Sequence, residues 1–192
     1  GGHAPVLIFE DCDLERTLDM VVPQKFRNAG QVCVSPTRFY VHESLYDAFL
    51  AGFAERTARV TVGDGLKAET RMGPLAHARR PEAVGALVED ARAKGARVLA
   101  GGERGDAGFF FQPTLLADVP NEAAIMNEEP FGPVAVTRAF RDFDEVIAEA
   151  NRLPFGLAAF AFTENGRRAN LLGDALEAGM VGINSFAISV AD

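Results

Sequence analysis

The sequence predicts an α/β fold: a three-layer α/β/α domain built on a mostly parallel sheet. Short apolar runs rich in Val, Phe and Ala alternate along the chain with longer segments whose apolar residues recur at helical spacing. This alternation is typical of parallel strands joined by helices that cover both faces of a sheet. No internal repeat, low-complexity run or flexible linker divides the 192 residues, so we expect a single domain.

The chain opens with a predicted strand at residues 6–9 and a predicted helix at 14–29. Asp13 has the side chain of a good N-cap for this helix. Pro23 interrupts the helical pattern, and a proline inside a helix removes a backbone hydrogen bond, so we expect two short helical pieces. Gly30 supplies the stop signal after them.

The same two patterns, short apolar runs and apolar residues at helical spacing, predict the remaining strands and helices. They are a strand at 37–42, a helix capped by Ser44, a loop at 63–74, a helix from Pro81 to Lys94, strands at 97–100, 133–140, 157–162 and 180–184, and helices at 142–152 and 164–177. The glycine-rich segment at 101–108 follows a strand, opens no helix and lacks the Lys-Ser/Thr ending of a phosphate-binding loop. We therefore interpret it as a connector.

Composition excludes several classes of protein. A net charge of −8 argues against a nucleic-acid partner, which usually requires clustered Lys and Arg. No apolar run approaches the roughly 20 residues of a membrane span, and no basic stretch followed by an apolar one marks a secretory signal, so we expect a cytoplasmic protein without a membrane partner. The two cysteines and three widely spaced histidines show no metal-binding spacing, so we expect no metal site.

The segment Phe26–Arg38, FRNAGQVCVSPTR, places one cysteine, Cys33, in a glycine-containing turn after the first helix. A cysteine acts as a nucleophile when its sulfur is partly exposed and nearby backbone N–H groups can hold the oxyanion that its attack creates. Gly30 and Gln31 fit such a turn. The alternative is that Cys33 is a small buried apolar residue, as most free cysteines are. The segment alone leaves both interpretations open.

A second informative segment, EEPFGPV, lies at Glu128–Val134. Together with RNAGQVC it resembles the signature motifs of the aldehyde dehydrogenase superfamily. Further segments match the family in the same order: GGHAPVLIFEDCDLE at 1–15, MGPL at 72–75, GFFFQPTLL at 108–116, FGLAAF at 155–160 and GMVGIN at 179–184. The resemblance covers the whole chain and is strongest to succinic semialdehyde dehydrogenase-like members.

The resemblance implies roles for three residues. Cys33 is expected to attack an aldehyde, giving a thiohemiacetal and then a thioester. Glu129 is expected to bind the ribose hydroxyls of NAD or NADP, because a carboxylate can accept from two adjacent O–H groups, and Phe131 to pack beside the ribose and nicotinamide. Without the motif, Glu129 would be interpreted as a solvated loop carboxylate and Phe131 as a core aromatic residue.

Two further residues bear on the substrate. Arg27 stands where succinic semialdehyde dehydrogenases carry an arginine, and a guanidinium can bind a distal carboxylate through two hydrogen bonds. Ser189 matches a serine that the same subfamily uses on that carboxylate. Both positions favour a dicarboxylic semialdehyde. The alternative is that Arg27 makes a surface ion pair of little consequence.

The resemblance also implies a division into domains. Residues 1–192 correspond to the catalytic, cysteine-bearing domain, whereas the dinucleotide-binding domain and the C-terminal assembly segment are expected to be absent from this chain. The glutamate that serves the family as general base is also absent. We therefore expect the isolated chain to be inactive, and the parent enzyme to be a homo-oligomer, a dimer or tetramer, that acts on a small aldehyde.

Two rival functions remain at this stage. A cysteine hydrolase would use Cys33 with a histidine base, but no histidine lies in a recognisable partner motif. A non-catalytic fragment or an assembly domain is the other alternative. Ser35 replaces the second cysteine of many succinic semialdehyde enzymes, which excludes a disulfide switch there. Cys12, beside acidic residues, and Asn184, after the last strand, are expected to be structural.

Overall fold

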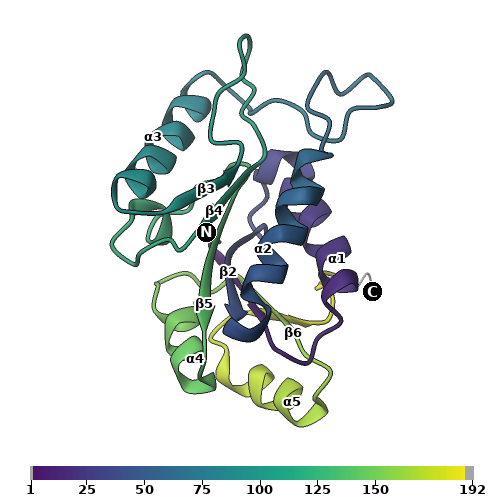
Figure 1. Ribbon diagram of the computed structural model, residues 1–192, viewed down its shortest axis with the longest axis vertical. Helices are drawn as coiled ribbons and strands as arrows, with labels where there is room; N and C mark the ends of the chain where they lie inside the picture. Colours follow the sequence, from purple (N-terminus) through teal and green to yellow (C-terminus); the bar gives the residue numbers. More distant parts are fainter. Residues whose placement is uncertain (1, 189–192) are drawn as a thin grey trace.

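The computed structural model describes residues 2–188 and shows a seven-stranded sheet with helices on both faces (Figure 1). The strands are β1 (Ala4–Ile8), β2 (Pro36–His42), β3 (Arg97–Ala100), β4 (Thr114–Ala117), β5 (Val134–Phe140), β6 (Ala158–Phe162) and β7 (Met180–Ile183). The helices are α1 (Leu14–Phe26), α2 (Glu43–Ala58), α3 (Arg79–Ala93), α4 (Phe143–Asn151) and α5 (Gly166–Ala175), with 3₁₀ segments η1 (Arg27–Gly30) and η2 (Ala124–Met126). The predicted α/β/α class is confirmed.

The strands lie in the order β3-β4-β5-β2-β1-β6-β7. Every neighbouring pair is parallel except β3 and β4, so the sheet is mostly parallel, as predicted. β1 is buried along its whole length, which explains its uninterrupted apolar sequence. The N-terminal end of this central strand lies beside the turn that carries Cys33.

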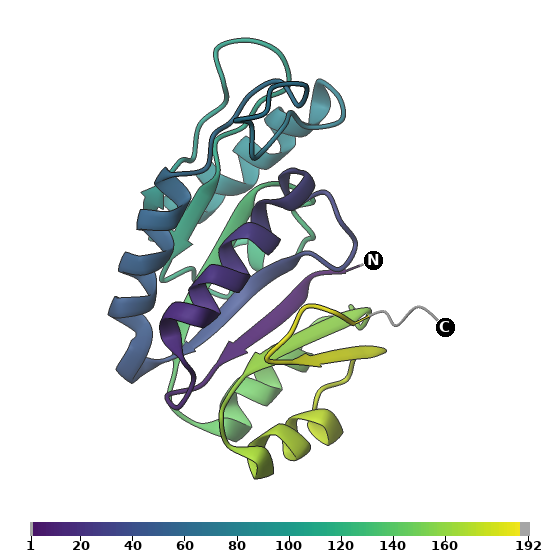
Figure 2. The same ribbon diagram turned by 90° about the vertical axis from the view of Figure 1, so that its right-hand side faces the viewer.

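The alternating side chains of β2 show what covers each face of the sheet. Phe39 packs against Phe49 and Phe53 of α2. Arg38 points to the other face, where it donates to the carbonyl oxygens of Glu149 and Ala150 near the end of α4. Figures 1 and 2 show α1 and α2 on one side of the sheet and α3 and α4 on the other.

Buried Arg38 links β1, β2 and α4. Its guanidinium donates to the His3 carbonyl oxygen at 3.0 Å, to the Tyr40 hydroxyl at 3.2 Å and to the two α4 carbonyl oxygens. A buried cation without such acceptors would cost several kcal/mol. The network therefore fixes the segment that leads into β1.

Helix α1 differs from its prediction. It is continuous through Pro23, whereas two pieces were expected. The break comes later, at η1, where the backbone at Asn28 and Ala29 turns left-handed. Asp13 caps the helix as predicted, accepting from the Arg16 N–H. The proline is tolerated because packing of the apolar side of α1 outweighs one missing hydrogen bond.

Two other local predictions were wrong. The N-cap of α2 is His42, whose Nδ1 accepts from the Ser44 N–H, so Ser44 lies inside the helix and does not cap it. No strand was predicted at Thr114–Ala117, yet β4 forms there between β3 and β5. The segment at 101–108 joins β3 to β4 and opens no helix, as expected for a connector.

Within residues 2–188, no helix is both long and apolar enough to cross a membrane. The same residues hold no group of three or more His, Cys, Asp or Glu side chains arranged to bind a metal ion.

Candidate active site

The site begins at a tight reversal of the chain after α1. Asn28, Ala29 and Gly30 have φ values of 50°, 53° and 71°, so three consecutive residues are left-handed. The Asn28 side chain donates to the Gln31 carbonyl oxygen, and the Gln31 side chain donates to the Asn28 carbonyl oxygen. These two hydrogen bonds support a conformation that is unfavourable for alanine and helps to turn the chain from α1 towards β2.

Cys33 lies in the turn that follows. The Ser35 N–H donates to the Val32 carbonyl oxygen at 2.9 Å, which makes Cys33 and Val34 the central residues of this turn. Cys33 is an exposed free cysteine, so the alternative of a buried apolar cysteine is wrong. No acceptor among residues 2–188 takes a hydrogen bond from the Cys33 N–H. An exposed thiol and a free N–H are thus present in the same residue.

The two signature motifs are in direct backbone contact. A Cβ on Gly30 would lie 2.1 Å from the carbonyl oxygen of Gly132, so the backbones touch where only glycine fits. Gly2 joins the motifs a second time. Its N–H donates to Glu129 Oε1 at 3.3 Å, and a Cβ on Gly2 would lie 1.8 Å from the Cys33 carbonyl oxygen. The structure therefore brings Cys33 and Glu129 into one site.

Glu129 is half-buried, and this burial raises the pKa of its carboxyl group. The Gly2 N–H opposes that rise in pKa, because it donates to the ionised form. Oε2 of Glu129 accepts no hydrogen bond from residues 2–188, and a carboxylate with a free oxygen fits the vicinal hydroxyls of a ribose. Whether Glu129 binds a ribose or is a solvated loop carboxylate is not decided by this geometry, so its role stays a prediction.

Phe131 projects from the same loop. It is 36 % exposed and has a φ of 40°, an unusual backbone conformation for a phenylalanine. Arg80 of α3 donates to the carbonyl oxygens of Pro130 and Phe131 and so holds the loop in place. The alternative of a core aromatic residue is wrong, because the side chain is among the exposed large hydrophobic residues.

Lys25 is a site residue that the sequence did not reveal. Its side chain is fully buried at the end of α1, and Nζ donates to Ser35 Oγ at 3.3 Å. Burial lowers the pKa of Lys25 from 10.5 to about 7, while the charge of Glu129 raises it. The only sequence signal was a lysine next to Phe26, at a position of the helix that its apolar pattern directs inward.

Arg27 is exposed at the start of η1. Its guanidinium forms no ion pair or hydrogen bond with the part of the chain that the structure describes, so the alternative of a surface ion pair is unsupported there. Ser189, the other predicted substrate residue, lies outside the described residues. Whether it meets Arg27 therefore stays a prediction.

Other predictions about polar residues can be compared with the structure. The Asn184 side chain donates to the Thr163 carbonyl oxygen and accepts from the Thr163 N–H, a structural role as expected. Burial raises the pKa of the Cys12 thiol, and the neighbouring Asp11 and Asp13 raise it further, which disfavours a thiolate as predicted. None of the three histidines hydrogen-bonds Cys33 within residues 2–188, so a cysteine–histidine hydrolase gains no support.

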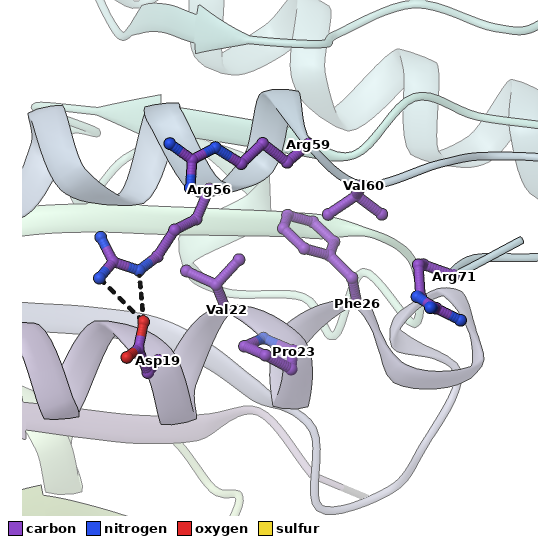
Figure 3. Close-up of a pocket in the computed structure, with 8 residues that line it drawn as sticks. All are labelled: Asp19, Val22, Pro23, Phe26, Arg56, Arg59, Val60 and Arg71. Atoms are coloured by element: carbon purple, nitrogen blue, oxygen red, sulfur yellow. Dashed lines mark hydrogen bonds and ion pairs between the residues drawn. The ribbon is translucent and has the colours of Figure 1, made fainter. Parts of the chain in front are cut away.

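A separate cavity of about 370 Å³ opens between α1 and α2 (Figure 3). Val22, Pro23, Phe26 and Val60 give it apolar walls, and Asp19, Arg56, Arg59 and Arg71 give it charged ones. Arg56 is already paired with Asp19 and Glu15. Neither Cys33 nor Glu129 lines this cavity, so we assign it no part in the chemistry of the site.

Comparison with known proteins agrees with this geometry. The model of the aldehyde dehydrogenase family matches residues 1–192. The chain belongs to the aldehyde dehydrogenase family. Family membership accounts for the joint presence of an exposed cysteine turn and the EEPFGP loop.

Individual relatives of the family are also similar over nearly the whole chain. A putative 4-(hydroxymethyl)benzenesulfonate dehydrogenase of Comamonas testosteroni is 46 % identical over 192 residues, which is 100 % of this chain and 40 % of that protein. The NADP(+) succinate-semialdehyde dehydrogenase of Escherichia coli is 44 % identical, over 98 % of this chain and 39 % of that protein. A crystal structure described as an E. coli NADP-dependent enzyme superposes with a TM-score of 0.96 at 43 % identity, covering 98 % of this chain and 40 % of that one. The chain thus spans about 40 % of the length of the relatives it matches.

Proposed function

We propose that residues 1–192 form the catalytic, cysteine-bearing domain of an NAD(P)-dependent aldehyde dehydrogenase, with Cys33 as the nucleophile. The observation that carries this proposal is the Gly2 bridge, which places the exposed Cys33 turn against the carboxylate of Glu129. A nucleophile beside a group suited to ribose hydroxyls supports thiol-based oxidation of an aldehyde.

The Cys33 thiolate forms a C–S bond with the aldehyde carbon, and the carbonyl electron pair moves onto oxygen. The N–H of Cys33, which has no acceptor within residues 2–188, donates to this oxyanion. Collapse of the oxyanion expels a hydride and leaves a thioester on Cys33. Bound NAD or NADP supplies the hydride acceptor. Water then hydrolyses the thioester with a general base, which we expect from a carboxylate outside this chain.

Glu129 and Phe131 orient the cofactor in this proposal. The Glu129 carboxylate accepts from the ribose hydroxyls, and the exposed Phe131 ring packs beside the ribose and nicotinamide. These two side chains do not distinguish NAD from NADP, because the nicotinamide and the ribose that carries it, which they are proposed to contact, are the same in both cofactors. Both cofactors therefore belong in the test.

For the substrate we propose an aldehyde that carries a second, acidic group, such as succinic semialdehyde. The exposed Arg27 guanidinium, six residues before Cys33, is free to bind a carboxylate through two hydrogen bonds. Ser189 is proposed to bind the same group. Two similar proteins are named for compounds that carry an acidic group, a sulfonate in one compound and a carboxylate in the other. This supports an anion-binding role for Arg27. A simple uncharged aldehyde is the alternative.

The remaining proposals follow from the family. We expect the complete enzyme to be cytoplasmic and to assemble as a homodimer or homotetramer. We also expect the 192 residues alone to release no NADH or NADPH in steady state, because the resemblance places the general base and the dinucleotide-binding domain in other parts of the family's proteins. A non-catalytic role for this chain is the second candidate, and sustained turnover by the isolated chain would exclude it.

The test is to express the complete reading frame that contains these residues and to follow reduction of NAD and NADP with succinic semialdehyde and with an uncharged aldehyde of similar length. The proposal requires turnover that Cys33→Ala abolishes and that the matched control Cys12→Ala retains. An Arg27→Met variant should raise KM for the semialdehyde more than for the uncharged aldehyde. Full activity of Cys33→Ala would refute the assignment of the nucleophile.

A further inference from the structure

Two cationic side chains are fully buried in the described residues, and their surroundings differ sharply. Arg38 has four acceptors around its guanidinium. Lys25 has an ammonium group with three N–H donors, yet within residues 2–188 only Ser35 Oγ accepts from it, at 3.3 Å. A buried ammonium with one neutral partner destabilises a fold, because desolvation is not offset. Stability therefore gives no reason for a lysine at this position.

The position of Lys25 supplies another reason. Ser35 is the last residue of the turn that holds Cys33, so the Lys25 ammonium contacts the turn from the helix side. The charged and titratable groups that act on Lys25 are Glu129, in the loop before β5, and His3, in the segment that leads into β1. His3 is neutral because burial lowers its pKa to about 3, which leaves Glu129 as the anion facing Lys25.

Gly2 contacts both halves of the site. It donates to Glu129 Oε1 and lies against the Cys33 carbonyl oxygen. The Glu129 carboxylate is thus held by one backbone N–H, and the charges of Lys25 and Arg80 also favour its ionised form. Both halves of the site, the thiol turn and the carboxylate, share Lys25 as a neighbour.

We propose that Lys25 is a positioning residue of the site: its buried ammonium group ties the Cys33 turn through Ser35 and, beneath that turn, attracts the Glu129 carboxylate that is to accept the cofactor's ribose. The inference rests on the proposed function, since it takes Glu129 as the ribose acceptor. It goes beyond that function by assigning a role to a residue that touches neither the aldehyde nor the thiol.

The test compares Lys25→Met with wild type in the complete protein. Methionine has a similar length and no charge, and Lys67→Met, at an exposed loop position, is the matched control. Cofactor affinity is measured by equilibrium titration without aldehyde, over a range of pH. We expect Lys25→Met to weaken cofactor binding by about tenfold, the loss of one charge-assisted interaction. In wild type, affinity should fall as pH rises through about 7, where Lys25 loses its proton, and Lys25→Met should lack this dependence.

A second readout separates positioning from packing. The unfolding temperature of the cofactor-free protein should rise in Lys25→Met, because the variant removes a poorly paired buried charge, while cofactor affinity falls. A lysine that served only the fold would give a lower unfolding temperature and an unchanged affinity. That pattern, or a wild-type pH dependence retained in Lys25→Met, overturns the proposal.

Ser35→Ala keeps the inference testable if Lys25→Met does not fold. This variant retains the ammonium and removes its acceptor, so it should weaken cofactor binding in the same direction by a smaller factor; unchanged affinity and pH dependence overturn the proposal. If the proposed function itself is wrong, the wild-type protein will neither bind cofactor nor oxidise aldehydes, and this result differs from a failure of the Lys25 inference alone. If wild type does both and Lys25→Met matches it, only the role of Lys25 is wrong.

Discussion

The backbone of Gly30 lies so close to the carbonyl oxygen of Gly132 that a Cβ on Gly30 would be 2.1 Å from that oxygen. Gly30 ends the reversal before Cys33, and Gly132 ends the loop that carries Glu129 and Phe131. A contact between two backbones cannot be relieved by rotating a side chain. This contact therefore sets the spacing of the two halves of the candidate site.

Gly30→Ala should destabilise the chain severely. The φ of Gly30 is 71°, so alanine adds backbone strain to the overlap with Gly132, and we expect a loss above about 3 kcal/mol in the free energy of unfolding. Gly95→Ala is the matched control. Gly95 also has a positive φ, 102°, but a Cβ there would meet nothing within 4 Å, so strain alone should cost about 1 kcal/mol. Equal losses in urea denaturation would show that the overlap is unimportant.

Arg38→Met should remove the link between β1, β2 and α4. Four acceptors lose a charged donor, and two of them are carbonyl oxygens near the C-terminal end of α4, so we expect a loss of about 3–5 kcal/mol. Arg141→Met is the control, because the Arg141 side chain is 80 % exposed and its pair with Glu43 should be worth about 0–1 kcal/mol. Chemical denaturation measures both, and a small effect of Arg38→Met would contradict the assigned role.

His3 should make the fold sensitive to acid. Burial lowers the pKa of His3 from 6.5 to about 3, while Nε2 donates to the Ile125 carbonyl oxygen, so the folded state holds a neutral ring. Because the unfolded chain binds the proton first, the stabilisation is complete above pH 6.5 and is lost as the pH falls from 6.5 towards 3, by a few kcal/mol. His3→Gln keeps an N–H donor and does not titrate. Its unfolding free energy should vary less with pH across this window, and parallel curves for the two proteins would contradict the account.

The sequence predicted those parts of the fold that depend on local signals. Asp13 caps α1 as predicted, because its side chain accepts from the Arg16 N–H in the first turn of the helix. β4 was missed because it forms through pairing with β3 and β5, which its local sequence does not show. Pro23 was misjudged because the packing of α1 is not visible in its local sequence.

The candidate site also has residues that the sequence predicted and residues that it did not. Cys33, Glu129 and Phe131 stand in motifs that can be recognised in the sequence, and the structure brings Cys33 and Glu129 together. The contributions of Gly2 and Arg80 could not be predicted, because they arise from contacts with residues distant along the chain, and that of Lys25 depends on how the chain turns back after α1. A lysine on an amphipathic helix is usually exposed, and only the folded structure shows that Lys25 is buried beside the Cys33 turn.

The most direct test of the central claim, that Cys33 is the nucleophile, is mass spectrometry of the complete protein quenched during turnover with succinic semialdehyde and NAD or NADP. The account predicts a covalent acyl adduct on the peptide that contains Cys33, absent when the aldehyde is omitted and absent from Cys33→Ala. An adduct on Cys12, or oxidation of the aldehyde at the wild-type rate by Cys33→Ala, would contradict it.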